Sequence, residues 1–188
     1  MNSLAEETVK AEQDEKDRRQ RLIEIEKEEE AKLKDDSLKN ESDDLILQHK
    51  PRVCVDGRIA RRLKEHQNGG VKFMYANMVE RVDRANSSEG QGCILAHCMG
   101  LGKTIQTLSF LQAVMCSKDL DMCRKVLILC PMNTLHNWLR ELHEWLDELE
   151  RPELACYSLN DSPTPKERVQ ELQRWHENGG IMVMGYDM

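Results

Sequence analysis

The chain has 188 residues, enough for one domain with a sizeable core but not for two large ones. Its formal net charge is −7, and residues 1–50 carry −6 of it, because they hold 16 acidic and 10 basic side chains. Residues 51–188 are therefore nearly neutral, so overall charge gives no support for nucleic-acid binding. It does not exclude nucleic-acid binding by a local basic groove. The N-terminus is polar and apolar runs reach four to five residues, which predicts no signal peptide, no membrane span and no membrane partner.

The seven cysteines are odd in number and contain no Cys-x-x-Cys pair. Several lie in apolar runs, where a reduced cysteine behaves as a small hydrophobic residue. This usage argues against a disulfide framework or a zinc site and predicts an intracellular protein in a reducing compartment.

Residues 6–34 are nearly all charged or polar and contain no glycine or proline. Opposite charges recur four residues apart, as in Glu12–Lys16 and Asp14–Arg18, a spacing that supports a helix. Apolar residues do not hold a heptad repeat, so a stable coiled coil is not predicted. Residues 1–50 are therefore expected to form a charged lead-in, helical or disordered, that is either a solvated linker or a helix that binds a protein partner.

The second segment, residues 51–188, begins with a β-like run at 52–55 and the turn signal Asp56-Gly57. A basic, helix-competent stretch follows at 58–64. After Gly69-Gly70, apolar residues fall at helical spacing and predict an amphipathic helix from Val71 to about Arg84.

The stretch from Gly92 to Thr104 has the order of a phosphate-binding loop. Cys93 to Ala96 is a short apolar run that predicts a buried strand, a turn with Gly100 and Gly102 follows, and Lys103-Thr104 opens a helix. Glycines allow backbone N–H groups to close around an anion, and the helix N-terminus adds its partial positive charge. Lys103 would then reach the outer phosphates and the Thr104 hydroxyl would ligate Mg²⁺.

The loop departs from the strict pattern in one place, because His97 stands where the first glycine is usual. His97 either approaches the nucleotide or fixes the loop by its ring. The alternative for the whole stretch is a glycine-rich turn that binds nothing. The strand-to-helix context favours a phosphate loop, and nucleotide binding is the prediction.

Beyond this helix the chain alternates strands and helices. Strands are predicted at 125–130, 154–159 and 181–184. Between them lie a helix capped by Asn133 or Thr134 and a helix at 166–178, whose Val169, Leu172 and Trp175 or His176 would face inward. This alternation predicts an α/β fold with a mostly parallel sheet flanked by helices, and the nucleotide at the carboxyl end of its first strand.

Hydrolysis of ATP needs a further acidic residue after an apolar strand, to hold Mg²⁺ and orient water. The candidate is Asp187, three residues beyond the run 181–184 and with no Glu following. Asp187 fits this role poorly, so the sequence predicts a chain that binds ATP and does not turn it over alone.

Four spaced segments resemble the Swi/Snf-type ATPases of helicase superfamily two, in the family's order. They are Leu63 to Gln67 with Gly70-Val71 and Phe73-Met74, then Gly92 to Gln106, Cys130 to Leu135 with Asn137-Trp138 and Glu141, and Leu172 to Trp175 with Gly179 to Met188. Most members have Asp-Glu where this chain has His97-Cys98, and the His-Cys form is typical of the ATRX-like branch. The resemblance covers roughly residues 51–188, and residues 1–50 share only their charge.

The resemblance implies two sets of site residues. For ATP, with Gln67 on adenine, they are Gln67, His97, Cys98, Met99, Gly100, Leu101, Gly102, Lys103 and Thr104. For the DNA backbone they are Pro131, Asn133, Thr134, Gly185 and Tyr186. The last two would place Asp187 on the DNA-tracking side rather than at a metal site.

As a whole, the resemblance implies a nuclear, DNA-dependent ATPase that translocates on duplex DNA and remodels nucleosomes. Residues 51–188 would be the N-terminal part of its first motor lobe, an incomplete P-loop (RecA-like) sheet lacking the acidic Mg²⁺ motif and the second lobe. Two alternatives stay open: a truncated, non-catalytic binding or regulatory module acting through the charged N-terminal helix, and an unrelated small-molecule P-loop NTPase or kinase.

Overall fold

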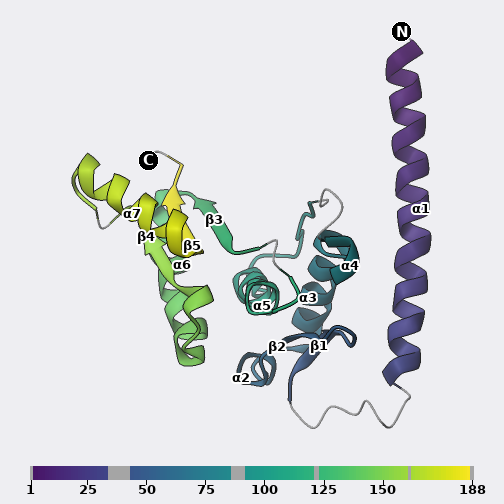
Figure 1. Cartoon of the computed structure of the whole chain (residues 1–188), viewed down its shortest axis with the longest axis horizontal. Helices are drawn as coiled ribbons and strands as arrows, with labels where there is room; N and C mark the ends of the chain where they lie inside the picture. Colours follow the sequence, from purple (N-terminus) through teal and green to yellow (C-terminus); the bar gives the residue numbers. More distant parts are fainter. Residues whose placement is uncertain (1, 34–42, 86–91, 121–122, 161, 187–188) are drawn as a thin grey trace. The chain divides into compact units, whose positions relative to one another are not determined.

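A computed structural model describes residues 2–33, 43–85, 92–120, 123–160 and 162–186. The chain divides into two units, Met1–Glu41 and Ser42–Met188. In the first, α1 (Asn2–Leu33) is one helix of 32 residues (Figure 1). Glu15 accepts hydrogen bonds from Arg18 at 3.0 Å and from Arg19 at 2.8 Å. The predicted charged helix is thus present as a continuous element.

The second unit opens with a small antiparallel sheet of β1 (Leu45–Gln48) and β2 (Val53–Val55). Strand β2 confirms the β-like run, whereas β1 lies in the stretch that the sequence assigns to the charged lead-in. Gln48 explains how this strand is held, because its buried Oε1 accepts hydrogen bonds from the Tyr75 hydroxyl and from the Val82 N–H. These partners are distant in sequence, so local pattern does not reveal them.

Three helices follow: α2 (Gly57–Ala60), α3 (Glu65–Met78) and α4 (Val82–Ala85). Helix α3 begins six residues before the predicted start at Val71 and runs through Gly69 and Gly70. Glycine costs a helix roughly 1 kcal/mol per residue. The Gln67 side chain accepts a hydrogen bond from the Lys64 N–H at the start of the helix, and this bond, together with burial of apolar residues such as Val71, offsets the cost.

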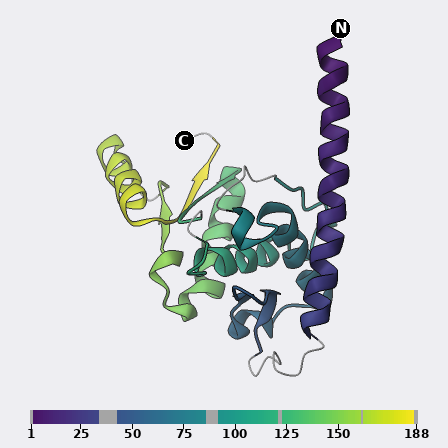
Figure 2. The same cartoon turned by 45° about the vertical axis from the view of Figure 1, so that its right-hand side comes forward.

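Helix α5 (Lys103–Met115) is the centre of the second unit. It packs against α3, β2 and α6 (Met132–Leu146). Every residue from Leu108 to Met115 is buried. Figure 1 shows α5 almost end-on between α3 and α6, and Figure 2 shows it from the side. Lys103, the first residue of α5, therefore lies at the start of a buried helix that other elements pack against from several sides.

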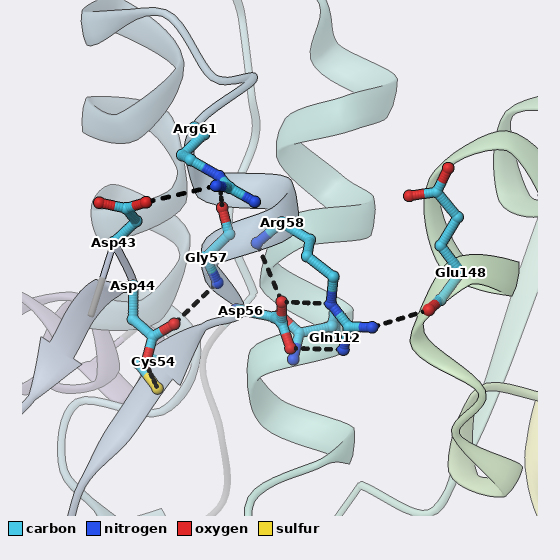
Figure 3. A network of polar contacts seen from close by, with 9 residues as sticks. All are labelled: Asp43, Asp44, Cys54, Asp56, Gly57, Arg58, Arg61, Gln112 and Glu148. Atoms are coloured by element: carbon cyan, nitrogen blue, oxygen red, sulfur yellow. Dashed lines mark hydrogen bonds and ion pairs between the residues drawn. The ribbon is translucent and has the colours of Figure 1, made fainter.

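A polar network fastens α5 to its neighbours (Figure 3). The Gln112 side chain on α5 accepts a hydrogen bond from the Asp56 N–H at 2.9 Å. Asp56 caps α2 by accepting from the Arg58 N–H, and its carboxylate also pairs with the Arg58 guanidinium. Hydrogen bonds from Arg58 hold the pKa of Asp56 below its ordinary value. Arg58 then donates to the Glu148 carbonyl, so one arginine joins α2 to the segment after α6.

The main sheet is parallel and has the strand order β3-β5-β4. Its strands are β3 (Lys125–Cys130), β4 (Cys156–Ser158) and β5 (Gly180–Gly185). The 3-10 helices η2 (Asp147–Leu149) and η3 (Pro152–Leu154) lead from α6 to β4, and α7 (Pro165–Asn178) leads from β4 to β5. The predicted α/β class, the parallel sheet and its three strands are confirmed.

Two details of the predicted helices are wrong. Neither Asn133 nor Thr134 caps α6, because the cap is Pro131 and both residues lie in the first turn. On α7, Val169 and Leu172 are exposed rather than inward. An apolar stripe is buried only where another element covers it, and here it is the half-buried Trp175 that reaches the sheet, donating to the Gly180 carbonyl at 3.0 Å.

The predicted strand Cys93–Ala96 is also wrong, because these residues have no regular secondary structure. Ile94 is 85% exposed. A strand needs a neighbour for its backbone hydrogen bonds, and among the described residues no strand pairs with this segment.

No helix in the described ranges has the length and apolar character to cross a membrane.

Candidate functional site

The loop before α5 has the backbone geometry that the sequence predicts. Gly100 and Gly102 have φ values of +84° and +73°, in the left-handed region that favours glycine. Gly102 is also the N-cap of α5, and a Cβ at this position would collide with the Gln67 amide nitrogen. Position 102 therefore requires glycine for two reasons, its backbone conformation and the close approach of α3.

Lys103 folds back over the loop. Its Nζ donates to the carbonyl oxygens of His97 at 2.8 Å and of Cys98 at 3.1 Å. These are neutral acceptors at an exposed position, and a phosphate is a stronger acceptor for an ammonium group. The loop thus holds a cation close to its own backbone, where an anion could take over its hydrogen bonds. Thr104, the predicted Mg²⁺ ligand, is half-buried in the first turn of α5.

Gln67 lies against the loop rather than apart from it. Its Nε2 donates to the Leu101 carbonyl at 3.3 Å, and its Oε1 accepts from the Lys64 N–H at 2.9 Å. The side chain is 8% exposed. The structure therefore brings the predicted adenine residue and the phosphate loop together, and both ends of the Gln67 amide are engaged by protein groups.

In the rest of the loop, the backbone carbonyls accept the hydrogen bonds and the side chains of 97–99 are exposed. His97, Cys98 and Met99 are exposed, and Met99 is 96% exposed. Leu101 contributes its inward carbonyl oxygen. Gln106 ends the segment that resembles the family's first motif, but the resemblance assigned it no role; its amide also donates to that carbonyl. The available signal was a polar series at three-residue spacing along the helix: Gln106, Ser109 and Gln112, all buried.

The predicted DNA-backbone residues meet at the carboxyl edge of the parallel sheet. Cys130 on β3 and Gly185 on β5 are register partners, and the Tyr186 N–H donates to the Cys130 carbonyl at 3.2 Å. A Cβ on Gly185 would collide with the Met132 sulfur at the start of α6, so glycine lets the two motifs touch.

Most of this edge is accessible. Pro131, Asn133 and Thr134 are exposed at the N-terminus of α6, and Tyr186 is 66% exposed. The Thr134 hydroxyl donates back to the Pro131 carbonyl at 2.8 Å, which tightens this first turn. A helix N-terminus beside exposed neutral donors can receive a phosphate. Asp187, the candidate Mg²⁺ acid, lies outside the described residues.

Comparisons with known proteins agree with these motifs. The family model of the SNF2-related domain matches residues 66–188. The transcriptional regulator ATRX of Homo sapiens is 38% identical over 138 residues, which cover 73% of this chain and 6% of that protein. The helicase ARIP4 of Xenopus tropicalis is 36% identical over 146 residues, 72% of this chain and 10% of that protein.

Among solved structures, the SWI2/SNF2 ATPase core of Sulfolobus solfataricus in complex with dsDNA aligns with a TM-score of 0.45 and 24% identity, over 66% of this chain and 21% of that one. This chain spans about a tenth or less of the length of the curated relatives just named. The family match covers both the phosphate loop and the carboxyl edge of the sheet, and the chain therefore belongs to the family of SNF2-related domains.

Proposed function

We propose that this chain binds ATP with Mg²⁺ through residues 97–104, as the ATP-binding portion of a nuclear, DNA-dependent translocase of the ATRX type. The observation that carries the proposal is the loop itself: two left-handed glycines and a folded-back Lys103 at the N-terminus of a buried helix. In the bound state Lys103 exchanges its two carbonyl partners for phosphate oxygens. Thr104 would hold the Mg²⁺, and the metal would supply charge neutralisation at the phosphates.

Gln67 would read the adenine. To do so, its amide must give up the hydrogen bond to the Leu101 carbonyl or share it with the base. An adenine presents a donor and an acceptor side by side, which a glutamine amide can pair, whereas guanine presents a different pattern. Gln67→Ala should therefore reduce the preference for ATP over GTP, and an unchanged preference would remove Gln67 from this role.

A binding experiment on the full chain tests the ATP site. Titration with Mg-ATP should give weak binding, and Lys103→Ala should abolish it while the exposed Lys72→Ala leaves it unchanged. Bound Mg-ATP should also slow alkylation of the exposed Cys98 thiol, a direct readout of loop occupancy. Equal ATP affinity of the wild type and Lys103→Ala would overturn the proposed site.

Turnover is a separate part of the proposal. We infer that this chain alone does not hydrolyse ATP at a rate that DNA stimulates. Hydrolysis needs an acidic residue at the end of an apolar strand to hold Mg²⁺, and the candidate, Asp187, fits poorly because it lies three residues beyond the run 181–184. Phosphate release should stay at background with and without duplex DNA. DNA-stimulated release that Lys103→Ala removes would contradict this inference.

The second partner we propose is the backbone of duplex DNA at the carboxyl edge of the sheet, with nucleosomes as the substrate of the whole motor. Asn133→Asp places a negative charge on this edge at a helix N-terminus, a position where it favours the helix but repels phosphate. DNA affinity at low salt should fall, with no loss of thermal stability.

Asn178→Asp is the matched control, because Asn178 is exposed before Gly180, where β5 begins at the opposite edge of the sheet. It should leave DNA affinity unchanged. Equal loss in both variants would indicate general charge repulsion and would remove the assigned edge.

A further inference from the structure

The least expected buried side chain near the loop is Gln106. It is fully buried in the second turn of α5, at 0% exposure. Its Nε2 donates to the Leu101 carbonyl at 3.1 Å and to the Gly102 carbonyl at 3.2 Å. Gln67 donates to the Leu101 carbonyl from the other side, at 3.3 Å. Two glutamine amides from different helices thus converge on the backbone of one phosphate loop.

The other end of the Gln106 amide has no such partners. Within the described residues, its buried Oε1 accepts no hydrogen bond. An unpaired buried acceptor costs stability, and an apolar side chain of similar shape would avoid that cost. Packing alone therefore does not explain a glutamine here, so the reason for its presence lies in what its amide donates to.

The two carbonyls determine where the neighbouring amides point. In a trans peptide unit, the C=O and the following N–H point in opposite directions. Because the Leu101 and Gly102 carbonyls are turned toward Gln106, the N–H groups of Gly102 and Lys103 are turned away from it. These are amides of the loop at the N-terminus of α5, and N–H groups that point the same way at a helix N-terminus can bind an anion.

We propose that Gln106 is a positioning residue, which orients the backbone amides of Gly102 and Lys103 for the phosphates of the nucleotide. This inference rests on the proposed ATP site and assigns to it a residue that does not touch the ligand. Gly70 completes the arrangement, because the Gln106 Oε1 lies where a Cβ on Gly70 would be, and His97 Cε1 lies 3.4 Å from the same point.

Gln106→Met and Gln112→Met form a matched pair on α5. Both residues are buried glutamines, but Gln112 accepts from the Asp56 N–H, away from the loop. The readout is binding of Mg-ATP and of adenosine to the full chain, at a temperature where each variant is folded. Gln106→Met should weaken ATP roughly tenfold, the scale of one or two lost hydrogen bonds, and should change adenosine binding less than twofold.

Gln112→Met should lower the unfolding temperature and leave the ratio of ATP to adenosine affinity unchanged. The inference is overturned if Gln106→Met keeps the wild-type ratio, or if both variants reduce the ratio equally. A wild type that binds neither ligand would instead defeat the proposed function itself, so the two failures are distinguishable.

A second pair avoids changing Gln106. Gly70→Ala should displace the Gln106 amide by collision, whereas the neighbouring Gly69 has no atom within 4 Å of a Cβ added there. Both changes raise helix propensity in α3. Gly70→Ala should reproduce the loss of ATP affinity with adenosine spared, and Gly69→Ala should bind both ligands as the wild type does. Normal ATP affinity in folded Gly70→Ala would contradict the positioning role.

Discussion

Helices α1 and α5 reach the same secondary structure by opposite routes. Most of the described side chains of α1 are exposed, and the ion pairs of Glu15 with Arg18 and Arg19 lie within the helix itself. Most residues of α5 are buried, and its two buried glutamines bond outside the helix, Gln112 to the Asp56 N–H and Gln106 to the loop before α5. One helix is supported by its own neighbours in sequence, the other by residues far away.

This difference in packing determines which of the two helices can support a phosphate loop at its N-terminus. A helix that is held from several sides can carry a strained loop at its N-terminus, because the surrounding packing absorbs the cost of left-handed residues. A helix held by exposed ion pairs cannot, since such pairs contribute little and are screened by salt. Of these two helices, α5 is the one with the packing that a phosphate loop needs.

The largest expected effect is in the core of α5. Leu108 is fully buried, so Leu108→Ala should lower the free energy of unfolding by about 3 kcal/mol. Ile23 on α1 is 46% exposed, and Ile23→Ala should change it by less than about 0.5 kcal/mol. Urea denaturation measures both. Similar losses in the two variants would mean that α1 is as well packed as α5.

The next effect is at the entry to α5. Gly102→Ala forces a left-handed conformation on alanine and a collision with Gln67, and it should cost about 1–2 kcal/mol. Gly92→Ala is the control, because no atom of the described residues lies within 4 Å of a Cβ added there. It should be neutral in the same denaturation experiment. A neutral Gly102→Ala would show that the loop tolerates another backbone conformation.

A smaller effect tests the ion pair between Asp56 and Arg58 at the start of α2. Asn can cap a helix as Asp does, so Asp56→Asn removes only the charge that pairs with Arg58, at about 0.5–1 kcal/mol. Arg58 lowers the pKa of Asp56 from 3.8, so this stabilisation is present above pH 4 and is lost as the pH falls through the folded-state value. Unfolding of wild type and variant should therefore converge in acid. A constant difference down to pH 2 would assign the loss to something other than charge.

The smallest effect is on the surface of α1. Glu15→Gln removes the charge that pairs with Arg18 and Arg19, and circular dichroism should record a slight fall in helix content at low salt. The difference should disappear at high salt because the exposed charges are screened. A difference that persists at high salt would point to a non-electrostatic role for this side chain.

The local sequence predicts the structure correctly at some residues and wrongly at others. Gly100 and Gly102 in front of Lys103 predict the loop, since few alternatives to glycine exist at positive φ. The run Lys125–Cys130 forms the predicted strand because β5 pairs with it along its whole length. The run Cys93–Ala96 has the same apolar character yet forms no strand, because pairing is supplied by a neighbour and not by the run. The roles of the ATP and DNA residues stay predictions.

Local sequence is enough to predict the charged helix α1, the glycine-Lys-Thr turn and the alternation of strands and helices, since each depends on residues within a few positions of one another. It does not predict that Gln67 and Gln106 converge on the Leu101 carbonyl, that Gly70 leaves room for a glutamine, or that Met132 meets Gly185 at one edge of the sheet. These contacts join elements far apart in the chain. Their hydrogen bonds and close approaches depend on how the helices pack, which no local pattern specifies.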